Sequence, residues 1–237
     1  MFVGSGYNAP MTWLLFACVI LIVVFGPMLW VRSVMRAHGK EVPGMPGTGG
    51  ELAQHLIDKF ELGAGVEVSA IGDHYDPKEK MVRLSPANFE GKSLTAVAVA
   101  AHEVGHAVQH HTHDRRLAMR TSLIPIADTI ARISSGMIWA APIVGALTRH
   151  PVPFSLLVLM GLSGLVMRML VHLVTLPTEV DASFGKALPM LEEGRYVAPG
   201  EEKIIRKILR AASMTYVAAA LADVLNLARW AALLLRR

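Results

Sequence analysis

The sequence has little cysteine and little charge for its length. A single cysteine, Cys18, stands among 237 residues, which excludes an internal disulfide framework and a cysteine-based zinc knuckle. Charged residues make up 18% of the chain and hydrophobic residues 53%, a balance that is typical of a membrane protein and unusual for a soluble one. Any bound metal ion must therefore be held by histidine and carboxylate side chains.

A basic stripe of the kind that binds nucleic acid is also absent. The chain carries 23 Lys and Arg against 19 Asp and Glu, a formal net charge of +4. These basic residues are scattered between apolar segments, without the interleaved aromatic residues of a nucleic-acid surface. We therefore expect no nucleic-acid partner, and we interpret the basic residues as markers of membrane topology.

Four long apolar runs predict a multi-pass membrane protein. Residues 11–31 form an uncharged run that is long enough to cross a bilayer, and they lack the basic start and the cleavage site of a signal peptide. Residues 123–147, 154–176 and 211–235 are three further candidates, whose few ionisable residues should face the bundle or the interface. The expected fold is mostly α-helical, with about four transmembrane helices.

These spans divide the chain into five parts. They are an N-terminal transmembrane anchor (1–31), a catalytic region (32–122), a transmembrane hairpin (123–176), a polar segment (177–210) and a C-terminal transmembrane helix (211–237). Lys and Arg gather beside both polar segments, whereas the turn between the second and third spans has only Arg149. The chain should therefore lie in a bacterial inner membrane with both polar segments in the cytoplasm. Arg236 and Arg237, at the far end of the last span, oppose this orientation. The topology of the last span is therefore left undecided.

The catalytic region predicts a small α+β, zincin-like unit. Residues 42–50 form a glycine- and proline-rich linker, and residues 51–62 form an amphipathic helix. Two β-type runs, residues 66–71 and 81–85, are expected to pair as a hairpin around the loop GDHYDPKEK. We interpret DHYDP in this loop as a turn with Asx-type hydrogen bonds rather than as a second metal site.

The motif HEVGH, residues 102–106, is the main candidate site, on a helix that Lys92 and Ser93 should open. His102 and His106 are four positions apart, so both rings project from one helix face and can bind one metal ion. Glu103 lies about 100° around the helix from His102, where it can take a proton from metal-bound water. This arrangement is typical of a zinc peptidase.

Two other features belong to the same helix. Gly105 costs about 1 kcal/mol of helix stability relative to alanine, so we expect another segment to pack closely against it. His110, His111 and His113 are expected to form a solvated or interfacial turn at the end of the helix rather than to bind metal.

A catalytic zinc ion needs a third protein ligand from elsewhere, because its fourth position is left for water. The metzincin continuation and the aspartate motif of site-2 proteases are both absent. The segment LPTEVDASFGKAL, residues 176–188, offers Glu179 and Asp181 just after the third span. Pro177 should end that span and Thr178 should cap a new helix, so the two acids either bind the metal or support the cap. Spacing alone leaves both alternatives open.

A resemblance adds to these observations. DHYDP, AVAVAAHEVGHAVQ, LPTEVDAS and AASMTYVAAAL, in this order, resemble the YugP-type family of bacterial membrane zinc metallopeptidases over about residues 1–235. That family resembles the HtpX and CAAX-processing membrane proteases, which have a gluzincin-like His, His, Glu site. The resemblance implies one zinc ion per chain, with His102, His106 and Glu179 as ligands and Glu103 as the base. It implies that Asp181 orients a histidine, or exchanges roles with Glu179.

Together these features predict a membrane-bound, zinc-dependent endopeptidase that cleaves membrane or unfolded proteins near the cytoplasmic membrane surface. A substrate peptide could add as a strand to the edge of the small sheet, unless the sheet merely covers the catalytic helix. Candidates for stabilising the transition state are His172, Arg168 and Tyr216.

Two alternatives remain. One is an intramembrane, site-2-like protease, in which residues 94–108 are themselves buried in lipid. The other is a non-catalytic membrane scaffold with a closed, four-ligand zinc site. The expected partners are protein or peptide substrates and the lipid bilayer, and the sequence identifies no protein partner.

Overall fold

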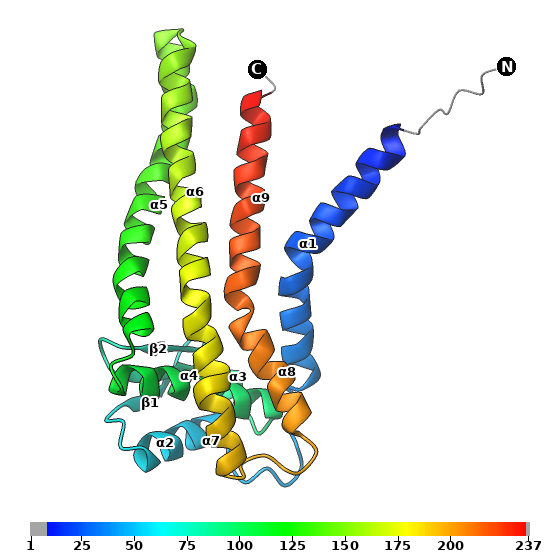
Figure 1. Cartoon of the computed structure of the whole chain (residues 1–237), viewed down its shortest axis with the longest axis vertical. Helices are drawn as coiled ribbons and strands as arrows, with labels where there is room; N and C mark the ends of the chain where they lie inside the picture. Colours follow the sequence, from blue (N-terminus) through cyan, green and yellow to red (C-terminus); the bar gives the residue numbers. More distant parts are fainter. Residues whose placement is uncertain (1–8, 236–237) are drawn as a thin grey trace, which may run out of the picture.

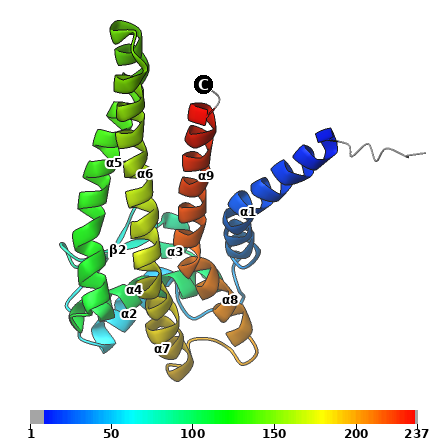
Figure 2. The ribbon, with the colours of Figure 1, turned by 45° about the horizontal axis from the view of Figure 1, so that its top comes forward.

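Long helices rise from one side of a smaller base that contains short helices and a three-stranded sheet (Figure 1). The computed structural model describes residues 9–235. The long helices α5 (Arg115–Thr148), α6 (Pro151–Val180) and α9 (Thr215–Leu235) follow one another across the molecule, with α6 between the other two in both views (Figures 1 and 2). The protein is therefore mostly helical, as predicted.

Three helices in the described part of the chain are long and apolar enough to cross a membrane. They are Arg115–Thr148, the continuous helix Pro151–Glu193 and Glu202–Leu225. The first two contain the predicted spans 123–147 and 154–176, and the third contains most of 211–235. Gly161 and Gly164 let α6 approach α5, since an added Cβ at Gly164 would lie 2.5 Å from the Ser134 Cβ.

The predicted first span lies within α1 (Ala9–Ala37), a helix of 29 residues. Several side chains of α1 are outside the described set, and α1 is not one of the three membrane-length helices found among the described residues. A fourth crossing thus remains a prediction. Arg236 and Arg237, which oppose the expected orientation of the last span, also lie outside the described residues.

The sheet differs from the predicted hairpin. It contains β1 (Gly65–Val68), β2 (His74–Asp76) and β3 (Met81–Leu84) in the order β1-β3-β2. β1 runs parallel to β3, and β2, which lies inside the predicted loop, pairs with β3 in the antiparallel direction. Arg83 on the central strand forms ion pairs with Glu67 of β1 and Asp76 of β2, so charge contacts join all three strands.

The predicted turn is correct at Asp76. Its Oδ1 accepts hydrogen bonds from the backbone N–H groups of Lys78 and Glu79, at 2.8 and 3.2 Å, which is an Asx-type turn. Asp73 instead accepts from the Ser85 backbone N–H and hydroxyl group. Both carboxylates are thus used within the base.

The helix that carries HEVGH, α4 (Leu94–His111), runs through the centre of the base. Ser93 caps its N-terminus by accepting from the Ala96 N–H, as predicted, and every residue from 94 to 107 is buried. The helices α2 (Gly49–Lys59), α3 (Pro86–Phe89), α7 (Leu188–Glu193) and α8 (Glu202–Ser213) all pack against α4. Protein, rather than lipid, covers α4.

The expected break at Pro177 does not occur. α6 continues through Pro177 to Val180 and then into a π-helix, η1 (Asp181–Ala187). A proline inside a helix loses its N–H donor and crowds the carbonyl group four residues before it, and packing of η1 on α4 offsets this cost. Thr178 is not a cap either, because its Oγ1 is buried without a hydrogen-bond partner.

The close contact predicted at Gly105 is confirmed. An added Cβ there would lie only 2.6 Å from the carbonyl oxygen of Ala182 in η1. The missing side chain therefore lets α4 and η1 touch backbone to backbone, next to both histidines of the motif.

Candidate metal centre

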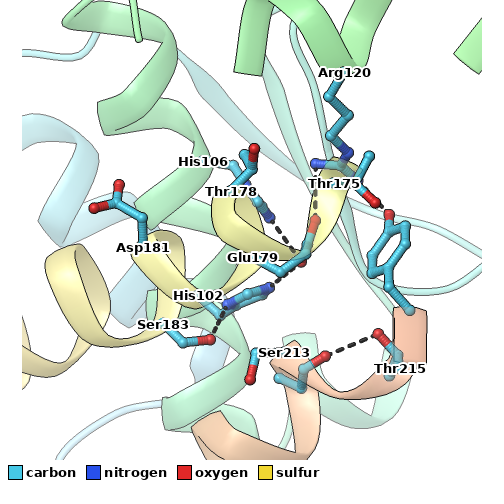
Figure 3. Close-up of polar contacts among 12 residues, drawn as sticks. His102, His106, Arg120, Thr175, Thr178, Glu179, Asp181, Ser183, Ser213 and Thr215 are labelled. Atoms are coloured by element: carbon cyan, nitrogen blue, oxygen red, sulfur yellow. Dashed lines mark hydrogen bonds and ion pairs between the residues drawn. The ribbon is translucent and has the colours of Figure 1, made fainter. Parts of the chain in front are cut away.

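The end of α6 brings Glu179 against the two histidines of α4 (Figure 3). Glu179 Oε2 lies 3.3 Å from His102 Nε2 and 3.4 Å from His106 Nε2. All three side chains are buried. They form the one group of at least three His, Cys, Asp or Glu side chains in the described residues whose ligand atoms lie within 4.8 Å of one another.

The His102 ring is oriented from η1. Its Nδ1 lies 2.9 Å from Ser183 Oγ (Figure 3), and that hydroxyl group donates its single proton to the Leu209 carbonyl oxygen at 3.2 Å. The Ser183 oxygen must then accept from His102 Nδ1–H. This contact holds the ring so that Nε2, the nitrogen that can bind a metal ion, faces Glu179.

The His106 ring is oriented through Gln109. The Gln109 amide nitrogen donates to the Thr178 carbonyl oxygen at 3.0 Å and to Asp181 Oδ2 at 2.8 Å. Its oxygen therefore faces His106 Nδ1, at 2.9 Å, and accepts from Nδ1–H. His106 Nε2 therefore faces Glu179 as well. Asp181 contacts this histidine through the glutamine rather than joining the cluster.

These residues fit a zinc ion. Two imidazole nitrogens and a carboxylate oxygen converge, with their ligand atoms within 4.8 Å of one another, so one cation could contact all three. Imidazole nitrogen and carboxylate oxygen are ligands that zinc accepts, and three protein ligands are the usual number in a catalytic site.

Glu103 lies beside this cluster, in a cavity of about 390 Å³ that His102, His106 and Glu179 also line. Burial raises the pKa of Glu103 to about 7, and the charge of Glu179 adds to this shift, while His102 opposes it. The carboxyl group can therefore gain and lose a proton near neutral pH.

The other walls of the cavity come from α1, α5, α6, α8, α9 and β2. Of the three predicted stabilisers of the transition state, Tyr216 and His172 line this cavity. Arg168 does not line it and lies instead one helical turn away, with its Nε 3.7 Å from Asp223 Oδ2. In the predicted solvated turn, His111 and His113 are exposed. His110 instead contacts the sheet, because its Nδ1 lies 2.7 Å from the Tyr75 hydroxyl group.

Arg120 is a site residue that sequence reasoning missed. It comes from the first turns of α5, and its Nη1 lies 3.2 Å from Glu179 Oε1, the oxygen that faces away from the histidines. Its Nη2 donates to the Tyr216 hydroxyl oxygen. No spacing links Arg120 to the motif, whereas Gln109 and Ser183 lie three and four residues after a ligand and could have been found as neighbours on a helix face.

The chain is similar to known proteins over most of its length. Residues 13–235 match the family described as "Putative neutral zinc metallopeptidase". The chain is 30% identical over 216 residues to "Putative membrane protease YugP" of Bacillus subtilis (strain 168), which covers 88% of this chain and 92% of the relative. No solved structure matches the chain. The family match spans nearly the whole sequence, and the chain therefore belongs to this family of neutral zinc metallopeptidases.

Proposed function

We propose that the protein is a membrane-bound, zinc-dependent endopeptidase, with His102, His106 and Glu179 as zinc ligands. The observation that carries this proposal is the convergence of two histidine Nε2 atoms and Glu179 Oε2 beside Glu103 in one cavity. When bound, zinc would lower the pKa of water and polarise the peptide carbonyl group. The chain's own residues would supply the proton transfers and the orientation.

Glu103 is the proposed general base. It accepts a proton from the attacking water as the new carbon–oxygen bond forms. It then donates that proton to the leaving nitrogen as the carbon–nitrogen bond breaks. A pKa of about 7 suits both steps.

Tyr216 is the proposed donor to the carbonyl oxygen as negative charge develops there. Arg120 donates to the Tyr216 oxygen, and no group among the described residues accepts the tyrosine's own proton. That proton is free for the substrate, and the arginine makes the hydroxyl group a stronger donor. His172 lies toward Asp223 instead, at 3.4 Å, so we rank it second.

The free edge of β2 is the proposed guide for the substrate backbone. In the described structure β2 pairs with β3 on one side only, and His74 and Tyr75 of β2 line the catalytic cavity. An extended peptide that hydrogen-bonds to this edge would run along the cavity. We therefore propose that the substrate adds as a strand along β2.

The base is proposed to face the cytoplasm of a bacterial inner membrane. The two alternatives are less well supported. α4 is enclosed by protein and is not a membrane-length helix in the described chain, whereas the intramembrane alternative needs it in lipid. A structural zinc site is usually closed by four protein ligands, whereas the described cluster offers three.

Metal content and casein cleavage by the purified protein test the proposal. We expect about one zinc ion per chain and cleavage that a chelator abolishes and zinc restores. Glu103→Gln should keep the zinc and lose the activity, whereas Glu192→Gln, a change in an acid on α7 away from the cavity, should keep both. Absence of zinc, or equal activity of Glu103→Gln and the unchanged protein, would contradict the proposal.

A further inference from the structure

Basic side chains gather on the exposed face of α8. They are Lys203, Arg206, Lys207 and Arg210, and all four are exposed. Spacings of three, one and three residues keep them on one side of the helix, opposite the side that is buried in the base. In the described structure only Arg206 forms an ion pair, with Glu192 at 2.7 Å.

The end of α1 adds a second set of basic side chains. Arg32 and Arg36 are exposed and one helical turn apart, and neither forms an ion pair within the described part of the chain. α1 packs against α8 and α9, and its end lies beside α8 in both views (Figures 1 and 2). We refer to Arg32, Arg36, Lys207 and Arg210 as the basic surface.

Two of the three arginines at the start of α5 are instead neutralised by the chain's own acids. Arg116 lies 2.8 Å from Asp114, and Arg120 lies 3.2 Å from Glu179. Around the basic surface, residues 31–40 and 203–210 contain no Asp or Glu. Its charge is therefore available to an anion from outside the chain.

The basic surface lies where α8 and α1 meet the membrane-spanning part. α8 and α9 together form a membrane-length helix, Glu202–Leu225. Arg210 stands five residues before the start of α9, a rise of about 7.5 Å. Trp30, two residues before Arg32, is exposed, and tryptophan is enriched at the boundary between membrane and water. These positions place the charges in the headgroup layer, which is about 5–7 Å thick on each side.

An anionic phospholipid matches this order of charged and apolar side chains. Its phosphate group can pair with guanidinium and ammonium groups, while its acyl chains can lie against Leu29 and Trp30, which are exposed just before Arg32. A soluble anion needs no such apolar surface. Basic clusters directly beside a membrane-spanning helix are also typical of anionic-lipid binding.

We propose that the basic surface binds the phosphate groups of anionic phospholipids. The same helix α8 contacts the metal centre, because its Leu209 carbonyl oxygen accepts from Ser183, and Ser183 contacts His102. Lipids bound to α8 therefore set the depth of the metal centre relative to the headgroups. Lipid binding here does not depend on the proposed peptidase function.

Trp30 can report the lipids beside the basic surface. The changes Trp13→Phe, Trp139→Phe and Trp230→Phe leave it as the one tryptophan of the chain. The full-length protein is placed in vesicles of equal parts phosphatidylglycerol and phosphatidylcholine, with bromine on the acyl chains of one lipid or the other. The charge of the vesicle is then constant, and the quenching of Trp30 measures which lipid is near. We expect an excess of phosphatidylglycerol, whereas equal quenching by both lipids would overturn the proposal.

Two pairs of substitutions test which charges matter. Each basic residue close to the surface strengthens binding about fivefold, so Arg32→Gln with Arg210→Gln should lower the excess about fivefold or more. The control, Lys203→Gln with Arg195→Gln, also removes two exposed positive charges. Lys203 is about 18 Å along the helix from α9, beyond the screening length of about 10 Å, and Arg195 follows α7 at the far end of the base (Figure 1). The control should keep the excess, and an equal loss in both pairs would show an effect of net charge and contradict the basic surface.

Salt separates binding of the phosphate group from a preference for the acyl chains. At about 1 M salt the screening length falls to about 3 Å, so we expect the excess of phosphatidylglycerol around Trp30 to shrink. The variant Arg32→Gln with Arg210→Gln should respond less, because fewer charges remain to be screened. An excess that high salt leaves unchanged would exclude the basic surface as its cause.

Discussion

The two histidine rings owe their orientation to residues on neighbouring turns. Ser183 holds His102, and Gln109 holds His106, each through Nδ1. Such contacts keep the ring in place and its Nε2 free, and their loss commonly costs 10–100-fold in metal affinity (roughly). The hydrogen bonds on the far side of the rings are thus as much part of the site as the ligands.

The first prediction follows from Ser183. We expect Ser183→Ala to weaken zinc binding by about tenfold or more, because His102 loses the acceptor that fixes its tautomer. Competition against a chelator of known affinity measures this. Ser213→Ala is the matched control, since Ser213 is also fully buried and donates to a backbone carbonyl group, that of Arg210, without contacting a ligand. Equal zinc affinities of the two variants would refute the role of Ser183.

The second prediction concerns Tyr216. Tyr216→Phe should lower kcat by about 100-fold or more, the typical cost of losing one donor to a developing oxyanion, with zinc content unchanged. Tyr75→Phe is the control, because Tyr75 lines the same cavity but its hydroxyl group is paired with His110. Steady-state kinetics with a peptide substrate separate the two. Similar losses in both variants would count against Tyr216 as the donor.

The site residues that could be predicted from the sequence are those whose relative positions follow from a fixed local spacing. The spacing of HEVGH puts His102 and His106 on one helix face in any fold, so this part was predictable. Arg120 was not, because only the tertiary arrangement carries the start of α5 to Glu179. Gln109, three residues after His106, could have been found as its neighbour on the helix face. Its contacts with Asp181 and Thr178, about 70 residues away, could not.

At the scale of elements, the contact between α4 and η1 determines the site. Gly105 allows the backbone of α4 to touch Ala182, and the π-helix then carries Asp181 and Ser183 toward α4. Single π-type turns within α-helices are frequent at functional sites. Here the start of the π-helix helps to orient both histidine rings. Ser183 contacts His102 directly, and Asp181 contacts His106 through Gln109.

The third prediction tests this contact. On an exposed helix, glycine to alanine stabilises by about 1 kcal/mol, but at Gly105 the added Cβ would meet Ala182 O at 2.6 Å. We expect Gly105→Ala to lower the free energy of unfolding by about 1–3 kcal/mol and to weaken zinc binding. Gly136→Ala in α5 is the control, because its Cβ meets nothing within 4 Å and should be neutral or stabilising. Denaturant unfolding in detergent gives both values, and stabilisation by Gly105→Ala would contradict the contact.

The elements that the sequence missed have identifiable causes. The strand β2 lies in GDHYDPKEK, whose Asp, Gly and Pro residues are typical of a loop, and its pairing depends on Arg83 and the central strand β3 rather than on alternation of its own residues. Pro177 was expected to end a helix, but packing of η1 on α4 outweighed the loss of one hydrogen bond. In both places tertiary contacts override a local signal.

At the scale of the whole molecule, the metal centre joins the base to the membrane-spanning part. Two of its proposed ligands come from α4 and the third from the end of α6, while Arg120 and Tyr216 come from the base-proximal ends of α5 and α9. The proposed active site thus lies where the long helices enter the base (Figure 1). The orientation of the long helices in the membrane therefore also decides on which side of the membrane the metal centre lies.

The fourth prediction concerns that orientation. Lys40 follows α1 and Arg115 begins α5, at the ends of these helices that meet the base, whereas the turn between α5 and α6 is at the opposite end (Figure 1). The positive-inside rule therefore predicts that the base lies in the cytoplasm. In a Cys18→Ser background, a membrane-impermeant maleimide should label Thr148→Cys in intact spheroplasts and Lys40→Cys only after lysis. Both positions are exposed in the protein, so a difference reflects the bilayer rather than burial. Labelling in the reverse order would place the metal centre outside the cytoplasm, and substrates would then have to present their outer membrane-proximal ends to Glu103.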